Sequence, residues 1–252
     1  MTVFILYCMI ETARELRDFR LTKYRICSPK LNGIRGTKKI IFLSDLHNRM
    51  YGKENERLLE SINNQHPDLI LIGGDMLVRK DGKSYDRTVR FLEKLPAICP
   101  VYCANGNHEQ KLKELPDKYE QSYEGYKKAL TACGIHMLEN ASETVRLDEA
   151  PVRISGLEIP LRAYARFGKK DLPLKEITDR IGEHGEEYQI LFAHHPGYIQ
   201  EYLEYGADLI LSGHYHGGVM QLPAIGGVIS PDFTLFPKYC GGIEREGSQT
   251  VV

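Results

Sequence analysis

The sequence predicts an α/β fold, a four-layer α/β/β/α sandwich in which two mixed β-sheets pack between outer helices. Short apolar runs alternate with amphipathic helical patterns in the first half, and short strands follow one another quickly at the start of the second half. A chain of 252 residues is also long enough to enclose one large core. We therefore expect one main domain, residues 36–252, after a short leader, residues 1–35.

The first half predicts a largely parallel sheet. Short apolar runs indicate buried strands, and apolar residues at helical spacing indicate amphipathic helices. Strands are expected at 39–44, 68–72 and 97–104, and helices at 55–65, 85–95 and 115–133. Pro96 and Gly134 mark the ends of the second and third helices. This alternation implies right-handed crossovers between parallel strands.

The second half is richer in strands. Strands expected at 135–138, 143–147 and 152–156 are close enough in sequence to form antiparallel ribbons. Helices at 174–183 and 199–205 then alternate with strands at 188–193 and 208–211. Two sheets covered by helices on their outer faces are the simplest packing of this order.

Charge and cysteine content limit the classes of partner. Lys and Arg number 33 against 34 Asp and Glu, so the chain has no global field to hold a polyanion, and no nucleic-acid partner is expected. The six cysteines form no CxxC pair and no zinc-finger spacing. They are expected to be reduced and mostly buried.

The leader raises the question of membrane contact. Its first ten residues are nearly all apolar, but a bilayer span needs about 20 such residues, and the flanks do not fit a secretory signal. Basic residues follow at Arg14, Arg17, Arg20, Lys23 and Arg25. Residues 1–20 are therefore expected either to rest on the inner face of the cell membrane or to dock as a helix, with a cytoplasmic domain.

Five polar clusters lie at or beside the ends of predicted strands, where open α/β sheets place their ligand sites. They are Asp45-Leu46-His47, Gly73-Gly74-Asp75, Gly106-Asn107-His108-Glu109, His194-His195-Pro196 and Gly213-His214-Tyr215-His216-Gly217-Gly218. Residues two apart in an extended segment point the same way, so Asp45 with His47, and His214 with His216, can each present two ligands together. The neighbouring glycines let the backbone approach an ion closely.

As a set, these clusters resemble the calcineurin-like metallophosphoesterases over about residues 38–238. Residues 44–47 and 213–218 look most like a bacterial branch whose members often carry an N-terminal membrane segment. The resemblance implies that Asp45, His47 and His216 hold one metal ion. It implies that Asn107, His194 and His214 hold a second ion, and that Asp75 bridges the two.

The chemistry of these ligands agrees with that assignment. Oxygen and nitrogen ligands without a thiolate suit two divalent ions, with Mn²⁺ favoured and Fe or Zn²⁺ as alternatives. Metal coordination lowers the pKa of water towards about 7, so a metal-bridging hydroxide would attack phosphorus in line. By the resemblance, His108 is the catalytic acid or a transition-state stabiliser. Glu109 is expected to brace its loop and His195 to pack against its neighbours.

The leading functional hypothesis is hydrolysis of a phosphodiester or phosphomonoester of a small or lipid-linked molecule. One alternative is a nuclease, which would bind DNA with a steep salt dependence. Another is a non-catalytic scaffold, although such a protein is expected to have lost ligands, and the set here is complete. The chain stops within a predicted strand at Thr250-Val251-Val252, so the C-terminal strands are expected to be incomplete or the sheet to close in another way.

Overall fold

The computed structural model describes residues 18–78, 84–118, 121–164, 171–218, 220–222, 226–231 and 233–252. Most of the predicted apolar leader, residues 1–17, lies outside these ranges. Residues 18–28 run without helix or strand and lead to a short 3₁₀ turn, η1 (Pro29–Leu31).

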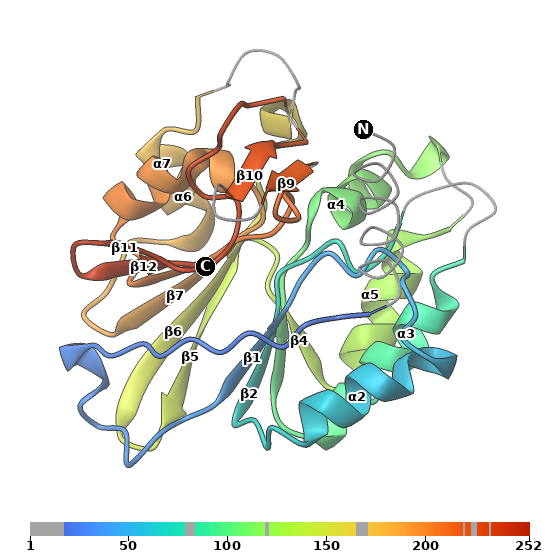
Figure 1. Ribbon diagram of the computed structural model, residues 1–252, viewed down its shortest axis with the longest axis horizontal. Helices are drawn as coiled ribbons and strands as arrows, with labels where there is room; N and C mark the ends of the chain where they lie inside the picture. Colours follow the sequence, from blue (N-terminus) through green and yellow to red (C-terminus); the bar gives the residue numbers. More distant parts are fainter. Residues whose placement is uncertain are drawn as a thin grey trace.

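The first sheet has four parallel strands in the order β1-β2-β3-β4 (Figure 1). They are β1 (Ile40–Leu43), β2 (Leu69–Ile72), β3 (Val101–Cys103) and β4 (Ile135–Met137). The helices of this half are α2 (Glu56–Asn63), α3 (Asp86–Leu92), α4 (Asn107–Glu114) and α5 (Tyr123–Ala132). The expected crossovers between parallel strands are thus present, and the helices lie on the outer side of the sheet (Figure 1).

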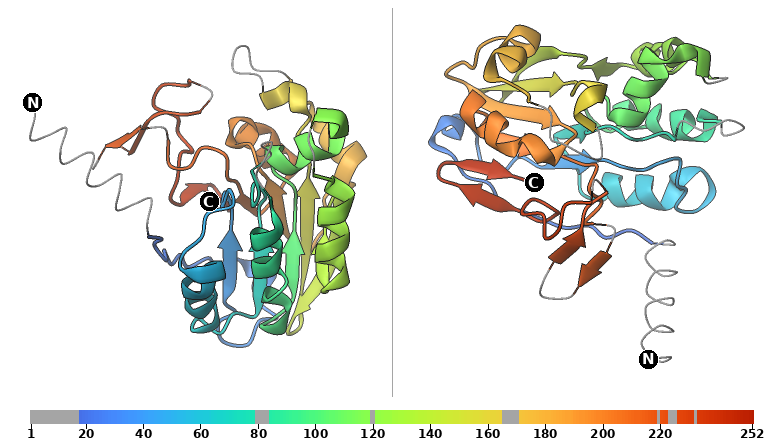
Figure 2. Two further views of the ribbon diagram at one scale, coloured as in Figure 1. Left: turned by 90° about the vertical axis from the view of Figure 1, so that its right-hand side faces the viewer. Right: turned by 90° about the horizontal axis from the view of Figure 1, so that it is seen from above.

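The second sheet has six strands and is mixed, in the order β11-β12-β8-β7-β6-β5. Its strands are β5 (Ala141–Leu147), β6 (Ala150–Leu157), β7 (Tyr188–Ala193), β8 (Leu209–Leu211), β11 (Glu244–Glu246) and β12 (Gln249–Val251). Two helices, α6 (Leu174–Ile181) and α7 (Ile199–Tyr205), belong to this half. A separate hairpin, β9 (Met220–Leu222) with β10 (Gly226–Ile229), stands off the two-sheet body (Figure 2).

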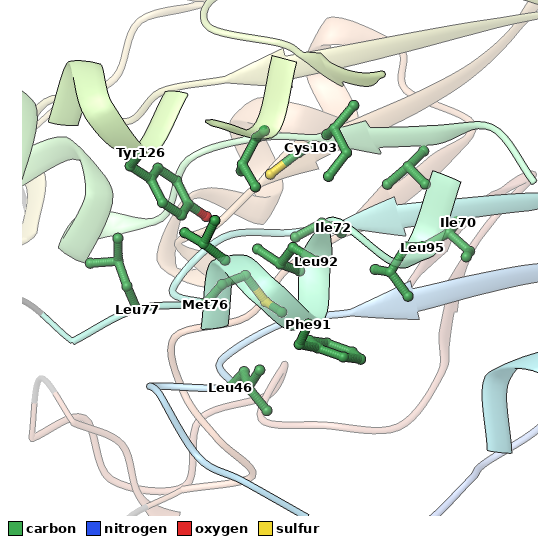
Figure 3. Close-up of a cluster of buried hydrophobic side chains, with 14 of the residues drawn as sticks. Leu46, Ile70, Ile72, Met76, Leu77, Phe91, Leu92, Leu95, Cys103 and Tyr126 are labelled. Carbon is green, nitrogen blue, oxygen red and sulfur yellow. The ribbon is translucent and has the colours of Figure 1, made fainter. Parts of the chain in front are cut away.

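The core lies in three layers, as a four-layer sandwich requires. Leu71 and Tyr102 of the first sheet share one buried cluster with Ile154 and Phe192 of the second, so this cluster joins the facing sheets. A second cluster joins the first sheet to its helices; Figure 3 shows Ile70, Ile72, Phe91, Leu92 and other members of it. A third cluster joins the second sheet to α6 and α7. The two-sheet architecture predicted from the sequence is confirmed.

Three local predictions were wrong. The helix expected at 115–133 is interrupted: Pro116 begins the 3₁₀ turn η4 (Pro116–Lys118), and α5 starts only at Tyr123. The strand at 135–138 does not join a ribbon, because β4 pairs in parallel with β3. The first sheet is parallel throughout, so only the second is mixed.

At the C-terminal end, β12 is paired on both sides, in parallel with β8 and antiparallel to β11. The described cysteines are free thiols: Cys27, Cys99, Cys103, Cys133 and Cys240. Only Cys103 and Cys240 of these are buried, so the expectation that the cysteines are mostly buried was wrong. Across the described ranges, we find no helix of the length and apolarity that a bilayer span needs.

Candidate metal centre

The five polar clusters meet at one edge of the molecule, where the parallel strands of both sheets end (Figure 1). Residues 45–47 follow β1, Gly73–Asp75 follow β2, and Asn107 and His108 open α4 after β3. His194 follows β7, while His214 and His216 follow β8. The predicted site residues therefore come from both sheets.

One group of side chains consists of Asp45, His47 and His216. The Nε2 atoms of His47 and His216 are 3.1 Å apart, and His216 Nε2 lies 3.3 Å from Asp45 Oδ1. His47 Nε2 lies 3.8 Å from the same carboxylate oxygen. One ligand atom from each residue lies within 4.8 Å of the other two, a spacing that a single ion could span.

A second group consists of Asp75, His194 and His214, whose ligand atoms also lie within 4.8 Å of one another. His194 Nε2 is 3.2 Å from Asp75 Oδ2. The same Asp75 oxygen lies 3.8 Å from His47 Nε2 and 4.0 Å from His108 Nε2. Asp75 therefore faces both groups, as a bridging ligand must.

Two buried atoms in this site have no hydrogen-bond partner: Asn107 Oδ1 and His194 Nε2. Leaving a buried polar atom unpaired costs about 1–3 kcal/mol. The Asn107 oxygen offers a lone pair, His194 Nε2 offers one once it has lost its proton, and both belong to residues predicted to hold the second ion. A divalent cation would satisfy them, so the residues present fit a metal site.

His194 is oriented by its other ring nitrogen. Nδ1 lies 2.8 Å from the carbonyl oxygen of Gly73, which can only accept, so Nδ1 carries the proton and Nε2 is left as the ligand atom. Burial lowers the pKa of His194, but the carboxylates of Asp75 and Asp45 outweigh it and raise the pKa to about 10. Without a metal ion, Nε2 is therefore protonated and faces Asp75, and a bound cation would take the place of that proton. Burial and the charge on His194 lower the pKa of His214 to about 2. The carboxylates thus create a field that favours positive charge at the position of a cation.

Glu109 braces the loop that carries Asp75, which confirms its expected role. One carboxylate oxygen accepts hydrogen bonds from the backbone N–H groups of Asp75, at 2.8 Å, and Gly106, at 3.0 Å. The other accepts from Met76 at 2.8 Å and Leu77 at 3.3 Å. This buried side chain therefore joins the loops that follow β2 and β3.

Five of the predicted ligands adopt the left-handed backbone conformation that side chains rarely occupy. Their φ angles are 57° at Asp45, 49° at His47, 52° at Asp75, 66° at His214 and 52° at His216. Each such residue costs on the order of 1–3 kcal/mol, and this strain is typical of functional sites.

The loops after β2 and β3 also approach each other closely at two glycines. Gly74 has a φ of 92°, and a Cβ atom at Gly74 would overlap the backbone nitrogen of Gly106. These glycines allow the two loops to touch.

The structure adds one residue that the sequence reasoning missed. The ring of Tyr164, at the end of η5 (Leu161–Tyr164), lies 4.9 Å from the ring of His195 and 5.1 Å from that of His214. Tyr164 lies a few residues beyond the end of β6, and a position after a strand end was a signal that the sequence offered. His195 packs as expected: its Nδ1 accepts the backbone N–H of Gly197 at 3.0 Å.

Sequence comparison gives the family of these motifs. The family model for calcineurin-like phosphoesterases matches residues 38–218. YkuE, an uncharacterized metallophosphoesterase of Bacillus subtilis, is 30% identical over 215 residues, which are 83% of this chain and 68% of that protein. The phosphodiesterase YaeI of Escherichia coli is 26% identical over 236 residues, which are 92% of this chain and 79% of that protein.

A solved structure supports the fold independently. Phosphopantetheinyl hydrolase (PptH) of Mycobacterium tuberculosis matches with a TM-score of 0.51 over 85% of this chain and 87% of that one. The two sequences are 14% identical, so this likeness bears on the fold alone.

Proposed function

The chain belongs to the calcineurin-like phosphoesterases and is a metal-dependent phosphoesterase, and we propose that it cleaves phosphoesters of small or lipid-linked molecules at a two-metal site. The observation that carries this proposal is the meeting of two ligand groups at one shared carboxylate. Asp45, His47 and His216 form one group, Asp75, His194 and His214 form the other, and Asp75 also faces His47.

In this proposal, seven residues hold two divalent ions, with Mn²⁺ favoured and Fe or Zn²⁺ as alternatives. The partition is the one implied by the sequence: Asn107 joins His194 and His214, and Asp75 bridges. The orphaned oxygen of Asn107 supports its inclusion. When bound, such ions supply a water of lowered pKa as nucleophile and neutralise charge on the phosphoryl oxygens.

We assign His108 to the leaving-group oxygen, as catalytic acid or as a stabiliser of developing charge. It lies on the first turn of α4, next to Asn107, and its backbone N–H donates to Asp75 Oδ1 at 2.8 Å. This hydrogen bond fixes the start of α4 against the bridging carboxylate. The imidazole is thereby held beside both ligand groups, with Nε2 4.0 Å from Asp75 Oδ2.

The substrate proposal rests on charge and on a relative. The near-neutral composition gives no field for a nucleic acid, so a small or lipid-linked phosphoester is preferred. YaeI is named a phosphodiesterase, which favours a diester over a monoester.

The test combines metal analysis with a substrate panel. Protein purified without chelator should contain two equivalents of a divalent ion and should hydrolyse chromogenic diesters faster than monoesters. Double-stranded DNA should not be cleaved at physiological salt. Full-length protein that binds fewer than two ions under saturating Mn²⁺, or that has no activity on any ester, would overturn the proposal.

The cytoplasmic location and the membrane contact of residues 1–20 also remain proposals. Cell fractionation decides them: the protein should be recovered from the cytoplasm or the inner membrane face, and high salt should release the membrane-bound part. Recovery from the periplasm or the medium would show that the leader has been misread.

A further inference from the structure

The turn that follows β10 presents large apolar side chains to solvent. Phe233 is 57% exposed, and Leu235 and Phe236 are each 65% exposed. Within the described ranges, the other exposed large hydrophobic residues are Leu21 and Tyr24, which are less exposed, at 42% and 41%. Large side chains exposed together in one short segment mark an interaction surface more often than isolated ones do.

This turn has a defined backbone. Phe236 N donates to Val228 O at 2.9 Å, Ser230 N donates to Thr234 O at 3.0 Å, and Thr234 N donates to Ser230 Oγ at 3.0 Å. Phe233 and Phe236 have φ angles of 64° and 49°, which are unusual for aromatic residues. The hydrogen bonds hold these strained residues in place, so the apolar side chains are displayed by a built structure.

The strand that precedes the turn, β10, packs against the end of the ligand loop. Gly218, two residues after His216, lies so close to β10 that an added Cβ would be 3.1 Å from Ile229 O and 3.2 Å from Gly227 Cα. The β9–β10 hairpin lies at the edge where the strands end (Figure 1). A membrane or protein surface that contacts the turn is therefore brought close to the loop that carries His214 and His216.

We propose that the turn that follows β10, through the exposed side chains of Phe233, Leu235 and Phe236, docks the protein on an anionic phospholipid surface. Docking there presents headgroup phosphoesters to the metal centre, so the inference narrows the substrate to a lipid-linked phosphoester. That part of it rests on the proposed function. The docking itself does not.

The small size of the apolar surface favours a membrane over a protein partner. Three large side chains about three-fifths exposed offer on the order of 350 Å², from roughly 150–250 Å² for each large side chain. A standard protein interface uses about 800 Å² from each partner. A membrane needs no matching surface, because a few apolar side chains can enter the boundary between headgroups and acyl chains.

Charge on a second exposed segment favours an anionic surface. Arg20, Lys23 and Arg25 are exposed and alternate with the exposed Leu21 and Tyr24. Basic residues near an anionic membrane are attracted to its surface charge. This pattern complements phosphate-bearing headgroups, and the apolar residues between the charges suit the same interface.

A tryptophan reporter tests the docking directly, because the chain contains no tryptophan. In the Leu235→Trp variant, the single indole should shift its emission to the blue on addition of phosphatidylglycerol vesicles. Lys128→Trp, on the exposed outer face of α5, is the matched control and should not shift. An unshifted indole at position 235 would overturn the proposal.

Sedimentation with vesicles gives the second measurement. The double variant Leu235→Ser/Phe236→Asn should bind phosphatidylglycerol vesicles on the order of 10-fold more weakly or worse. Asn suits the left-handed backbone at position 236, so folding should be retained and can be checked by the melting temperature. Phe236→Leu keeps an apolar side chain and should retain binding. If the double variant binds as tightly as the parent, the turn has no role, and any binding comes from elsewhere in the chain.

Activity on a soluble chromogenic diester separates this inference from the proposed function. The double variant should cleave the soluble diester at the parental rate and lose activity only on a phosphodiester presented in vesicles. Loss on both substrates would contradict a docking role. A parent that binds vesicles but cleaves neither substrate would overturn the proposed function and leave the docking surface supported.

Discussion

The two halves of the candidate metal centre use similar ligands but differ in burial. The side chains of Asp75 and His194 are 2% and 1% exposed, whereas those of His47 and His216 are 22% and 42% exposed. Glu109 and the carbonyl of Gly73 fix the buried half. In the exposed half, Asp45 accepts from Ser44 Oγ at 2.6 Å and from the backbone of His214 at 3.0 Å.

This difference indicates that one ion position is built before metal arrives and that the other depends on a surface loop. Ligands held by buried neighbours lose little freedom when they bind an ion, whereas an exposed loop must be ordered. We therefore expect the buried half to bind its ion more tightly. Asp75 belongs to both halves, so it gives the strongest test.

The largest effect is expected for Asp75→Asn. An amide cannot supply the negative charge that offsets two dications, so both ions should be lost and activity should fall by at least about 10⁴-fold. Metal content and turnover are measured on the same sample. If one ion stays at full occupancy, the two halves do not share this ligand.

The next largest effect on activity is expected for His108→Ala. We expect both ions to be retained and turnover to fall on the order of 10²–10⁴-fold, as for loss of an acid. The loss should be greater for esters with poor leaving groups. Equal rates for the variant and the parent with poor and good leaving groups would remove His108 from the chemistry.

Glu109→Gln tests the brace of the buried half. A glutamine offers one acceptor oxygen to backbone N–H groups that now use two, so we expect a loss of about 2–4 kcal/mol in the free energy of unfolding. Urea titration measures it. Glu54→Gln, which removes an exposed partner of Arg90, is the control and should change stability little. Similar stability of the two variants would mean that the buried half is not held by Glu109.

The smallest effect concerns the order of metal loss. Under EDTA, the ion at Asp45, His47 and His216 should leave first, with two phases that differ on the order of tenfold in rate. Metal content followed over time gives the phases. Single-phase loss would show that the difference in burial does not set the difference in binding.

Open α/β sheets place their ligand sites at the ends of strands, so the site could be located from the sequence once the strands were recognised. The runs that became β1, β2 and β7 are short and apolar, and the polar residues directly after them are Asp45, Gly73 to Asp75 and His194. The architecture followed from the order of strands and helices. The position of each ligand group at the strand ends could therefore be predicted, although its geometry could not.

Other features needed the folded chain. Asp45 and Asp75 have a left-handed backbone. Aspartate enters this region more readily than most residues, but it also occurs widely elsewhere, so its presence alone could not locate the conformation. Pro116 interrupts the helix predicted from 115 to 133, because proline cannot continue a helix whose first residues precede it, although the helical pattern extends beyond it. Tyr164 is not a metal-ligating residue type, so the ligand pattern in the sequence does not single it out.

The division of ligands between the two sheets also fixes the order in which the centre is synthesised. Asp45, His47, Asp75 and Asn107 follow strands of the first sheet, whereas His194, His214 and His216 follow strands of the second. About 110 residues separate Asn107 from His216, which at about 5–20 residues per second is a delay of roughly 6–20 s on the ribosome. During that interval the nascent chain carries four of the seven ligands without His194, His214 and His216, so the complete centre can form only after His216 has been made.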